Sequence, residues 1–83
     1  MAARVVLTTS IARAFAGGQA EHVVEGREVR HLIRALDVRF PGIAARLEDG
    51  VAVAIDGVIH QNAFFELVPE GAEICFIPAI EGG

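Results

Sequence analysis

The sequence predicts an α+β fold, with one main helix packed on a mixed four- to five-stranded sheet. Three observations support this prediction: a single helical stripe near the middle of the chain, short apolar or β-branched runs on both sides of it, and turn residues between those runs. Of the 83 residues, 53% are apolar, which is enough for a core of modest stability in one small domain.

The first part of the chain is typical of a β-hairpin. Residues 4–9 are rich in β-branched side chains and predict a strand, and residues 21–24 predict a second strand paired with it. Between them, residues 10–18 end in a glycine pair, so we expect a loop that can contain a helical turn. Glu25 and Gly26 form the turn that leads out of the second strand.

The clearest element is a helix that begins near residue 29. Its apolar residues recur at i, i+3, i+4, i+7 and i+11, along one helix face: Val29, Leu32, Ile33, Leu36 and Phe40. Glu28 favours the helix N-terminus electrostatically, although glutamate is a poor N-cap. Pro41 and Gly42 end the helix, and residues 43–47 can form one more turn.

The second half of the chain predicts three more strands. Residues 51–55 and 58–60 flank Asp56-Gly57, a dipeptide typical of a tight hairpin turn. Residues 61–68 are expected to be irregular. After a turn at 69–71, residues 73–77 predict the last strand. The resulting order, β-β-α-β-β-β, is the β-grasp arrangement of ubiquitin, with the helix as a crossover connection.

Charge is unevenly divided along the chain. Up to Arg46, seven arginines and four acids give +3, and from Leu47 onward seven acids and no basic residue give −7. The acidic second half argues against nucleic acid or an anionic membrane as a partner and suits a basic protein. The chain contains no lysine, so its own side chains cannot accept an isopeptide bond.

A soluble, cytoplasmic protein is expected. The single cysteine excludes an intrachain disulfide, and because Cys75 lies in an apolar run we expect a buried, inert thiol. The apolar stretch 5–7 is too short for a secretory signal, and no stretch approaches the ~18 apolar residues of a membrane span. The histidines and Cys75 lack ligand spacing, so no metal site is expected.

The end of the chain is its most informative feature. A short apolar strand continues through Pro78 to Gly82 and Gly83. Proline cannot extend a ladder, and glycine loses the most conformational freedom when it is held in place. The glycine pair adds no evident stability, but a tail without side chains can enter a narrow channel and present its carboxylate there. We therefore expect residues 1–78 to form one domain and residues 79–83 a flexible tail.

Several segments resemble the MoaD/ThiS family of ubiquitin-like sulfur carriers. Residues 70–83, EGAEICFIPAIEGG, are similar to the family's D-G-D-E-V-x-x-x-P-P-V-x-G-G ending. The strings RFPG at 39–42, LEDG at 47–50 and VAIDG at 53–57 look like the small subunit of molybdopterin synthase. The resemblance covers nearly the whole chain and is closest to this molybdopterin branch.

The resemblance implies that Gly83 carries the chemistry. A ubiquitin-activating-type enzyme would use ATP to adenylate its carboxyl group, and a persulfide supplied by a sulfurtransferase would displace AMP and leave a thiocarboxylate. The anion is the nucleophilic form of such a sulfur. Gly82 would matter because a Cβ beside the reacting carbonyl would crowd the adenylating site and the acceptor channel. The chain itself would hold no tight cofactor and would not be an enzyme alone.

The resemblance also implies partner contacts. Residues that match Ile59 and Ile77 lie, in the family, on the sheet face opposite the helix and meet the partner. Ile80 would anchor the tail in an apolar slot, Pro78 would set its exit direction, and Glu81 would contact the partner with them. The predicted acceptor is an enzyme such as the large molybdopterin synthase subunit.

Three departures from the family leave the partner open. Ala79 replaces a second proline, Thr-Thr-Ser at 8–10 stands where an aromatic followed by alanine is frequent, and residues 60–65 match no motif of the best-known molybdopterin carriers. The acceptor can therefore belong to another pathway, such as cysteine, thiazole, tRNA or a specialised metabolite. Two other classes also remain: a ubiquitin-like modifier joined through Gly83 to lysines, and a plain interaction module.

Other features are interpreted as structural. Arg27, Arg30 and Arg34 share one helix stripe, which a solvated helix face explains more simply than a partner or phosphate site. Of Phe64 and Phe65, one is expected to lie in the core. No Ser/His/Asp or Cys/His pair has a spacing that indicates a catalytic site within the chain.

Overall fold

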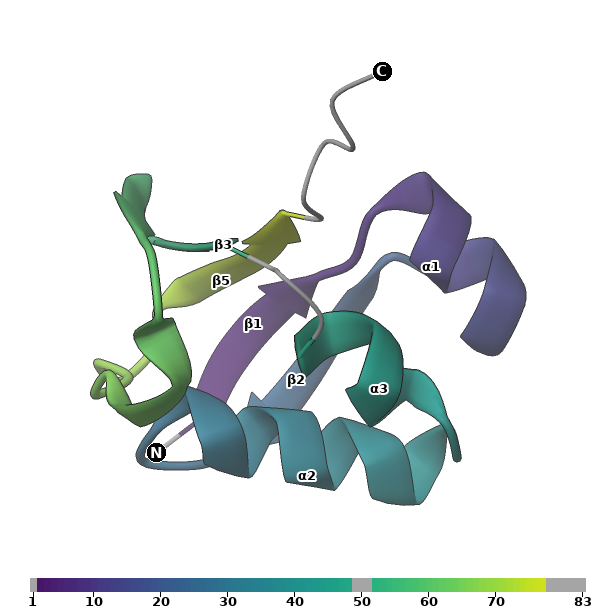
Figure 1. The fold of residues 1–83 in the computed structure, drawn as a ribbon, viewed down its shortest axis with the longest axis horizontal. Helices are drawn as coiled ribbons and strands as arrows, with labels where there is room; N and C mark the ends of the chain where they lie inside the picture. Colours follow the sequence, from purple (N-terminus) through teal and green to yellow (C-terminus); the bar gives the residue numbers. More distant parts are fainter. Residues whose placement is uncertain (1, 49–51, 78–83) are drawn as a thin grey trace.

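The computed structural model, which describes residues 2–48 and 52–77, has two layers: a mixed five-stranded sheet and a layer of helices (Figure 1). The elements follow one another in this order: β1 (Ala2–Val6), α1 (Thr9–Phe15), β2 (Glu21–Glu25), α2 (Val29–Arg39), α3 (Ile43–Glu48), β3 (Ala52–Ile55), β4 (Val58–His60), the 3-10 helix η1 (Ala63–Phe65) and β5 (Glu73–Ile77). The predicted α+β fold, with one main helix on a mixed sheet, is confirmed.

The sheet joins two hairpins through its last strand. Its strand order is β2-β1-β5-β3-β4, with β1 and β5 parallel at the centre and the other neighbours antiparallel. The β3–β4 hairpin turns at Asp56 and Gly57, whose φ angles of 48° and 85° suit the tight two-residue turn predicted there. Because β5 lies between the hairpins, the described chain ends at Ile77, in the middle of the sheet.

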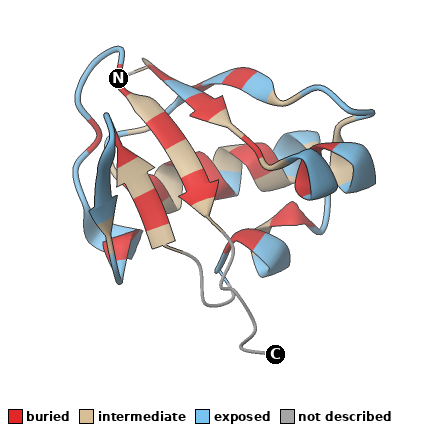
Figure 2. Ribbon diagram, turned by 90° about the horizontal axis from the view of Figure 1, so that it is seen from above, coloured by how far each residue is buried: buried red, intermediate tan, exposed pale blue. Residues whose placement is uncertain are grey.

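The core forms where α2 covers one face of the sheet. Apolar residues of α2 and of alternate strand positions are at most 4% exposed and belong to one cluster: Val29, Leu32, Ile33, Leu36, Val5, Val24, Val53, Ile74 and Phe76. Figure 2 looks onto the other face, where buried residues along the strands alternate with less buried ones. Phe40, the last residue of the predicted stripe, caps α2 and meets the ring of His22 edge-on, with centroids 5.1 Å apart.

The connection between β1 and β2 differs from the sequence prediction. The strand ends at Val6 rather than at residue 9, and the expected loop is largely the helix α1. Thr8 starts this helix, because its Oγ1 accepts a hydrogen bond from the Ile11 amide at 3.3 Å. Ile11 and Ala12 are buried, so α1 extends the core at the end of the sheet where β5 ends (Figure 1).

Residues 61–68, predicted to be irregular, contain η1 and a short bridge to the start of α2. The Val29 amide donates to the Glu66 carbonyl at 3.0 Å, and the Val68 amide donates to the Arg27 carbonyl at 2.8 Å. These two hydrogen bonds hold the segment after η1 against the N-terminus of α2.

Gly26, in the turn before α2, occupies a position where a side chain does not fit. A Cβ there would lie 2.9 Å from the Cβ of His31 and 3.0 Å from Cδ2 of Leu32. We expect Gly26→Ala to lower the free energy of unfolding by about 1–3 kcal/mol, because packed neighbours must move. Urea unfolding measures this effect, with the exposed Val38→Ala as control. A wild-type midpoint for Gly26→Ala would contradict the prediction.

Candidate functional site

The sheet face turned away from α2 carries a strip of apolar side chains. The register aligns one residue from each of four strands in a row: Val6, Cys75, Ala54 and Ile59. Residues aligned across neighbouring strands point to the same face. None of the four is buried, and Ile59 is 62% exposed. We call this row, together with the aligned pair Ala52 and Ile77, the sheet strip.

Both sheet residues predicted as partner contacts belong to the sheet strip. Ile77 pairs with Ala52, two positions along β3 from Ala54, which pairs with Ile59. The structure therefore brings Ile59 and Ile77 to one face, opposite the helix as predicted, while their role in binding stays a prediction. The other predicted site residues lie outside the described residues: Pro78, Ile80, Glu81, Gly82 and Gly83.

Charged groups border the sheet strip, and most of them are acidic. Arg4 Nη2 lies 2.8 Å from Glu73 Oε2, and the two side chains are 55% and 43% exposed, so this ion pair adds little stability. Glu21 is aligned with Val6, and Asp56 Oδ1 accepts a hydrogen bond from the Glu73 amide at 2.9 Å. An apolar strip with an acidic border suits a partner surface that is apolar and basic.

Cys75 lies in the middle of the sheet strip and is half-buried, so the prediction of a buried thiol is wrong. Strand alternation turns its side chain to the outer face, whereas Ile74 and Phe76 enter the core. Partial burial raises the pKa of the Cys75 thiol, and the Glu73 carboxylate, which accepts a hydrogen bond from Sγ at 3.9 Å, raises it further. The thiolate, which is the reactive form, is therefore scarce at neutral pH.

This raised pKa predicts slow alkylation of Cys75. At neutral pH we expect iodoacetamide to modify the folded protein more slowly than the urea-unfolded protein, with a rate that climbs at higher pH than for a free cysteine. Glu73→Gln removes the neighbouring negative charge and should increase the rate. Intact-mass time courses measure all three rates, and equal rates for folded and unfolded protein would contradict the raised pKa.

The histidines make structural contacts. His22 Nε2 lies 2.7 Å from the Gln19 carbonyl oxygen, His31 Nδ1 accepts a hydrogen bond from the Glu28 amide at 3.2 Å, and His60 Nδ1 lies 4.0 Å from Glu66 Oε1. Within residues 2–48 and 52–77, no three His, Cys, Asp or Glu side chains are grouped so that they could hold a metal ion. None of the helices in these ranges is long and apolar enough to cross a membrane.

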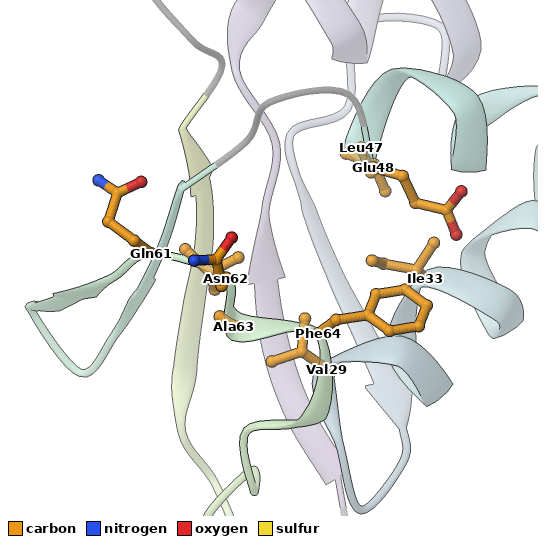
Figure 3. A pocket seen from close by; sticks show the side chains of 9 residues that line it. Val29, Ile33, Leu47, Glu48, Gln61, Asn62, Ala63 and Phe64 are labelled. Atoms are coloured by element: carbon orange, nitrogen blue, oxygen red, sulfur yellow. The ribbon is translucent and has the colours of Figure 1, made fainter.

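A cleft of about 330 Å³ opens between α2, the end of α3 and η1 (Figure 3). Its lining combines apolar side chains with three polar ones, Glu48, Gln61 and Asn62. One carboxylate and two amides do not supply a nucleophile with an activating base, so the described lining offers no catalytic arrangement. The sheet strip is the better candidate for a functional surface, because it lies beside the end of β5.

The prediction that one phenylalanine of the pair after β4 lies in the core is wrong. Phe64 and Phe65 are 40% and 67% exposed, and the buried residue of η1 is Ala63. Asn62, with a φ of 54°, turns the chain into η1 so that Ala63 faces the core. Two adjacent phenylalanines carry no periodicity, so no sequence signal indicated which side chain would face inward.

Comparison with known proteins gives consistent matches over nearly the full length. The model of the ThiS family matches residues 6–83. The molybdopterin synthase sulfur carrier subunit of Pyrenophora tritici-repentis is 27% identical over 81 residues, covering 94% of this chain and 87% of that protein.

Solved structures show the same fold. A chain of the Amycolatopsis orientalis BexX/CysO complex matches with a TM-score of 0.81 at 26% identity, covering 98% of this chain and 99% of that chain. SAMP1 from Haloferax volcanii matches with a TM-score of 0.78 at 22% identity, covering 100% of both chains. The predicted β-grasp arrangement is confirmed by these likenesses.

Proposed function

Because this chain belongs to the ThiS family of ubiquitin-like sulfur carriers, we propose that its Gly83 carboxyl group is the site where sulfur is loaded. The observation that carries the proposal is the extent of the family match, which runs from the end of β1 through β5 to Gly82 and Gly83. Sulfur carriers of this family are small carrier proteins rather than catalysts, so catalysis is assigned to partner enzymes.

The proposed reaction begins when a ubiquitin-activating-type enzyme transfers AMP from ATP to the Gly83 carboxylate and releases pyrophosphate. The terminal sulfur of a persulfide donor then displaces AMP, and a second thiol of the donor system cleaves the acyl disulfide to release the thiocarboxylate. ATP phosphates are bound by basic groups. In this proposal the partner supplies them, because the sheet strip is bordered mainly by acids. The sheet strip is the proposed contact, with the tail residues Pro78, Ile80 and Glu81 guiding Gly83.

The proposed acceptor is the large subunit of molybdopterin synthase. The 27% identical relative is described as a sulfur carrier subunit of molybdopterin synthase, which supports this choice. The 26% identical chain comes from a complex with BexX, so an acceptor from another pathway is the alternative. A cytoplasmic location is compatible with either acceptor and is part of this proposal.

Intact-mass analysis of the protein isolated from its own cells tests the carrier chemistry. A gain equal to the exchange of one oxygen for one sulfur supports a thiocarboxylate, whereas adducts of the chain on other proteins support a modifier. If neither species forms even with the activating enzyme, ATP and a sulfur donor, the carrier function is wrong. Loaded protein mixed with the large molybdopterin synthase subunit and its substrate should lose sulfur; retention of sulfur there would favour a different acceptor.

A further inference from the structure

Three exposed apolar side chains gather around η1, away from the sheet strip. Phe64, Phe65 and Leu67, which we call the aromatic cluster, are 40%, 67% and 65% exposed. The ring of Phe64 meets that of Phe65 edge-on, with centroids 5.3 Å apart at 88°. Exposed apolar groups that occur together, rather than singly, are typical of interaction surfaces.

The backbone beneath the aromatic cluster is fixed by hydrogen bonds. Those from Val29 to Glu66 and from Val68 to Arg27 flank a bridge between Glu28 and Leu67. A surface held this way loses little conformational entropy on binding. In Figure 1 the η1 segment lies at the end of the sheet where β5 begins, whereas Ile77 lies at the other end.

Hollows lie on both sides of the aromatic cluster. Phe64 lines the cleft of about 330 Å³, and Figure 3 shows its ring reaching toward the α2 side, where Ile33 lies. A second hollow of about 340 Å³ is lined by Arg27, Leu67, Val68 and Pro69. Each hollow has room for a bulky apolar side chain of another protein, and apolar anchors in pockets dominate the energetics of many interfaces.

Arginines lie beside Phe65 and the second hollow. The guanidinium carbon of Arg30 lies 5.1 Å from the centroid of the Phe65 ring, a cation–π contact, and its Nε lies 2.8 Å from Glu28 Oε1. Arg27 precedes α2 and lines the second hollow, and Arg34 lies one turn after Arg30 on the same helix face. The acids nearby are Glu28, which pairs with Arg30, Glu66, which lies 4.0 Å from His60, and Glu48, which lines the first cleft. In the described lining of the second hollow, the charged residue is Arg27.

We propose that the aromatic cluster is a second docking surface, which binds an acidic segment of a partner protein that carries a bulky apolar side chain. The apolar side chain would fill the second hollow, and the carboxylates would face Arg27 and Arg30. Because the cluster and the end of β5 lie at opposite ends of the sheet, it can be occupied while the tail is engaged elsewhere. This inference goes beyond the carrier function and does not depend on any chemistry at Gly83.

A random dodecapeptide phage library, selected against the intact chain, tests the proposal. We expect enriched peptides to combine Asp or Glu with Leu or Phe. One such peptide, synthesised, should bind the wild-type protein about tenfold more tightly than Phe65→Ser or Arg30→Gln. Val58→Ser, which changes a residue that is 60% exposed on β4, should bind like wild type. Thermal unfolding checks that all three variants are folded.

Four outcomes of the peptide experiments would overturn the proposal. They are the absence of any enriched peptide, enrichment without acidic residues, equal binding to wild type and Phe65→Ser, and NMR shift changes confined to the sheet strip. Sedimentation of the chain alone tests whether a second copy of this chain occupies the aromatic cluster. Self-association that Phe65→Ser abolishes would assign the cluster to that second copy, against the proposal. The peptide-binding and sedimentation measurements do not depend on thiocarboxylate formation. Failure of the proposed carrier function and failure of this docking surface can therefore be told apart.

Discussion

Deletion of Gly82 and Gly83 is expected to abolish thiocarboxylate formation. The shortened chain would end at Glu81, whose Cβ and carboxylate would lie directly beside the reacting carboxyl group. The added bulk would not enter a channel suited to glycine, and the negative charge would repel the ATP phosphates at the adenylating site. The measurement is intact mass after incubation with the activating enzyme, ATP and a persulfide donor.

Two further variants show what the deletion removes. Gly82→Ala keeps the Gly83 carboxylate and adds only a methyl group, so we expect the same product at a lower rate. Val38→Ser, at a residue of α2 that is 80% exposed, should load sulfur like wild type. Full loading of the chain without its last two residues would mean that the reactive carbonyl is not the one at the end of the tail.

The elements that the sequence predicted well depend on local patterns. The α2 stripe follows a 3.6-residue period, and Asp56-Gly57 has the composition that a tight hairpin turn requires, so neighbouring residues alone contain both signals. The end of α2 was likewise marked by Pro41 and Gly42. Such features do not depend on which distant segment packs against them.

The sequence predicted only a loop that can contain a helical turn where α1 lies, because the stability of this helix depends on tertiary packing. It has 7 residues, which is too short for independent stability, and it is held by the burial of Ile11 and Ala12. The one local signal was Thr8, whose hydroxyl caps the helix. The Thr-Thr-Ser departure from the family at 8–10 therefore has a structural reason in this chain.

The sheet strip could be anticipated only through the family resemblance. Its row joins residues from β1, β5, β3 and β4, and no sequence pattern gives the register between strands so far apart in the chain. The same limit explains the error at Cys75: an apolar run predicts burial, but alternation in β5 turns this thiol outward. The position of the sheet strip follows from the strand pairings in the structure.

Ile59→Asp is expected to slow sulfur loading by the activating enzyme about 30-fold or more at low concentrations of the carrier. An aspartate in the sheet strip would have to lose its hydration against an apolar partner surface, and truncating a central contact residue costs at least about 2 kcal/mol of binding. The tail is unchanged, so the maximal rate at saturating concentrations of the carrier should stay near wild type. The expected signature is therefore a raised KM with little change in kcat.

Val58→Asp is the matched control for this prediction. Val58 precedes Ile59 on β4 and is 60% exposed against 62%, but it pairs with the buried Ile55 and so points to the opposite face. Aspartate has the same low strand propensity at both positions. If destabilisation of strand β4 itself weakened binding, both variants would therefore show it. An equal rise in KM for both would assign the effect to the strand, and an unchanged KM for Ile59→Asp would exclude the sheet strip as the contact. Only a rise confined to Ile59→Asp fits docking through this face.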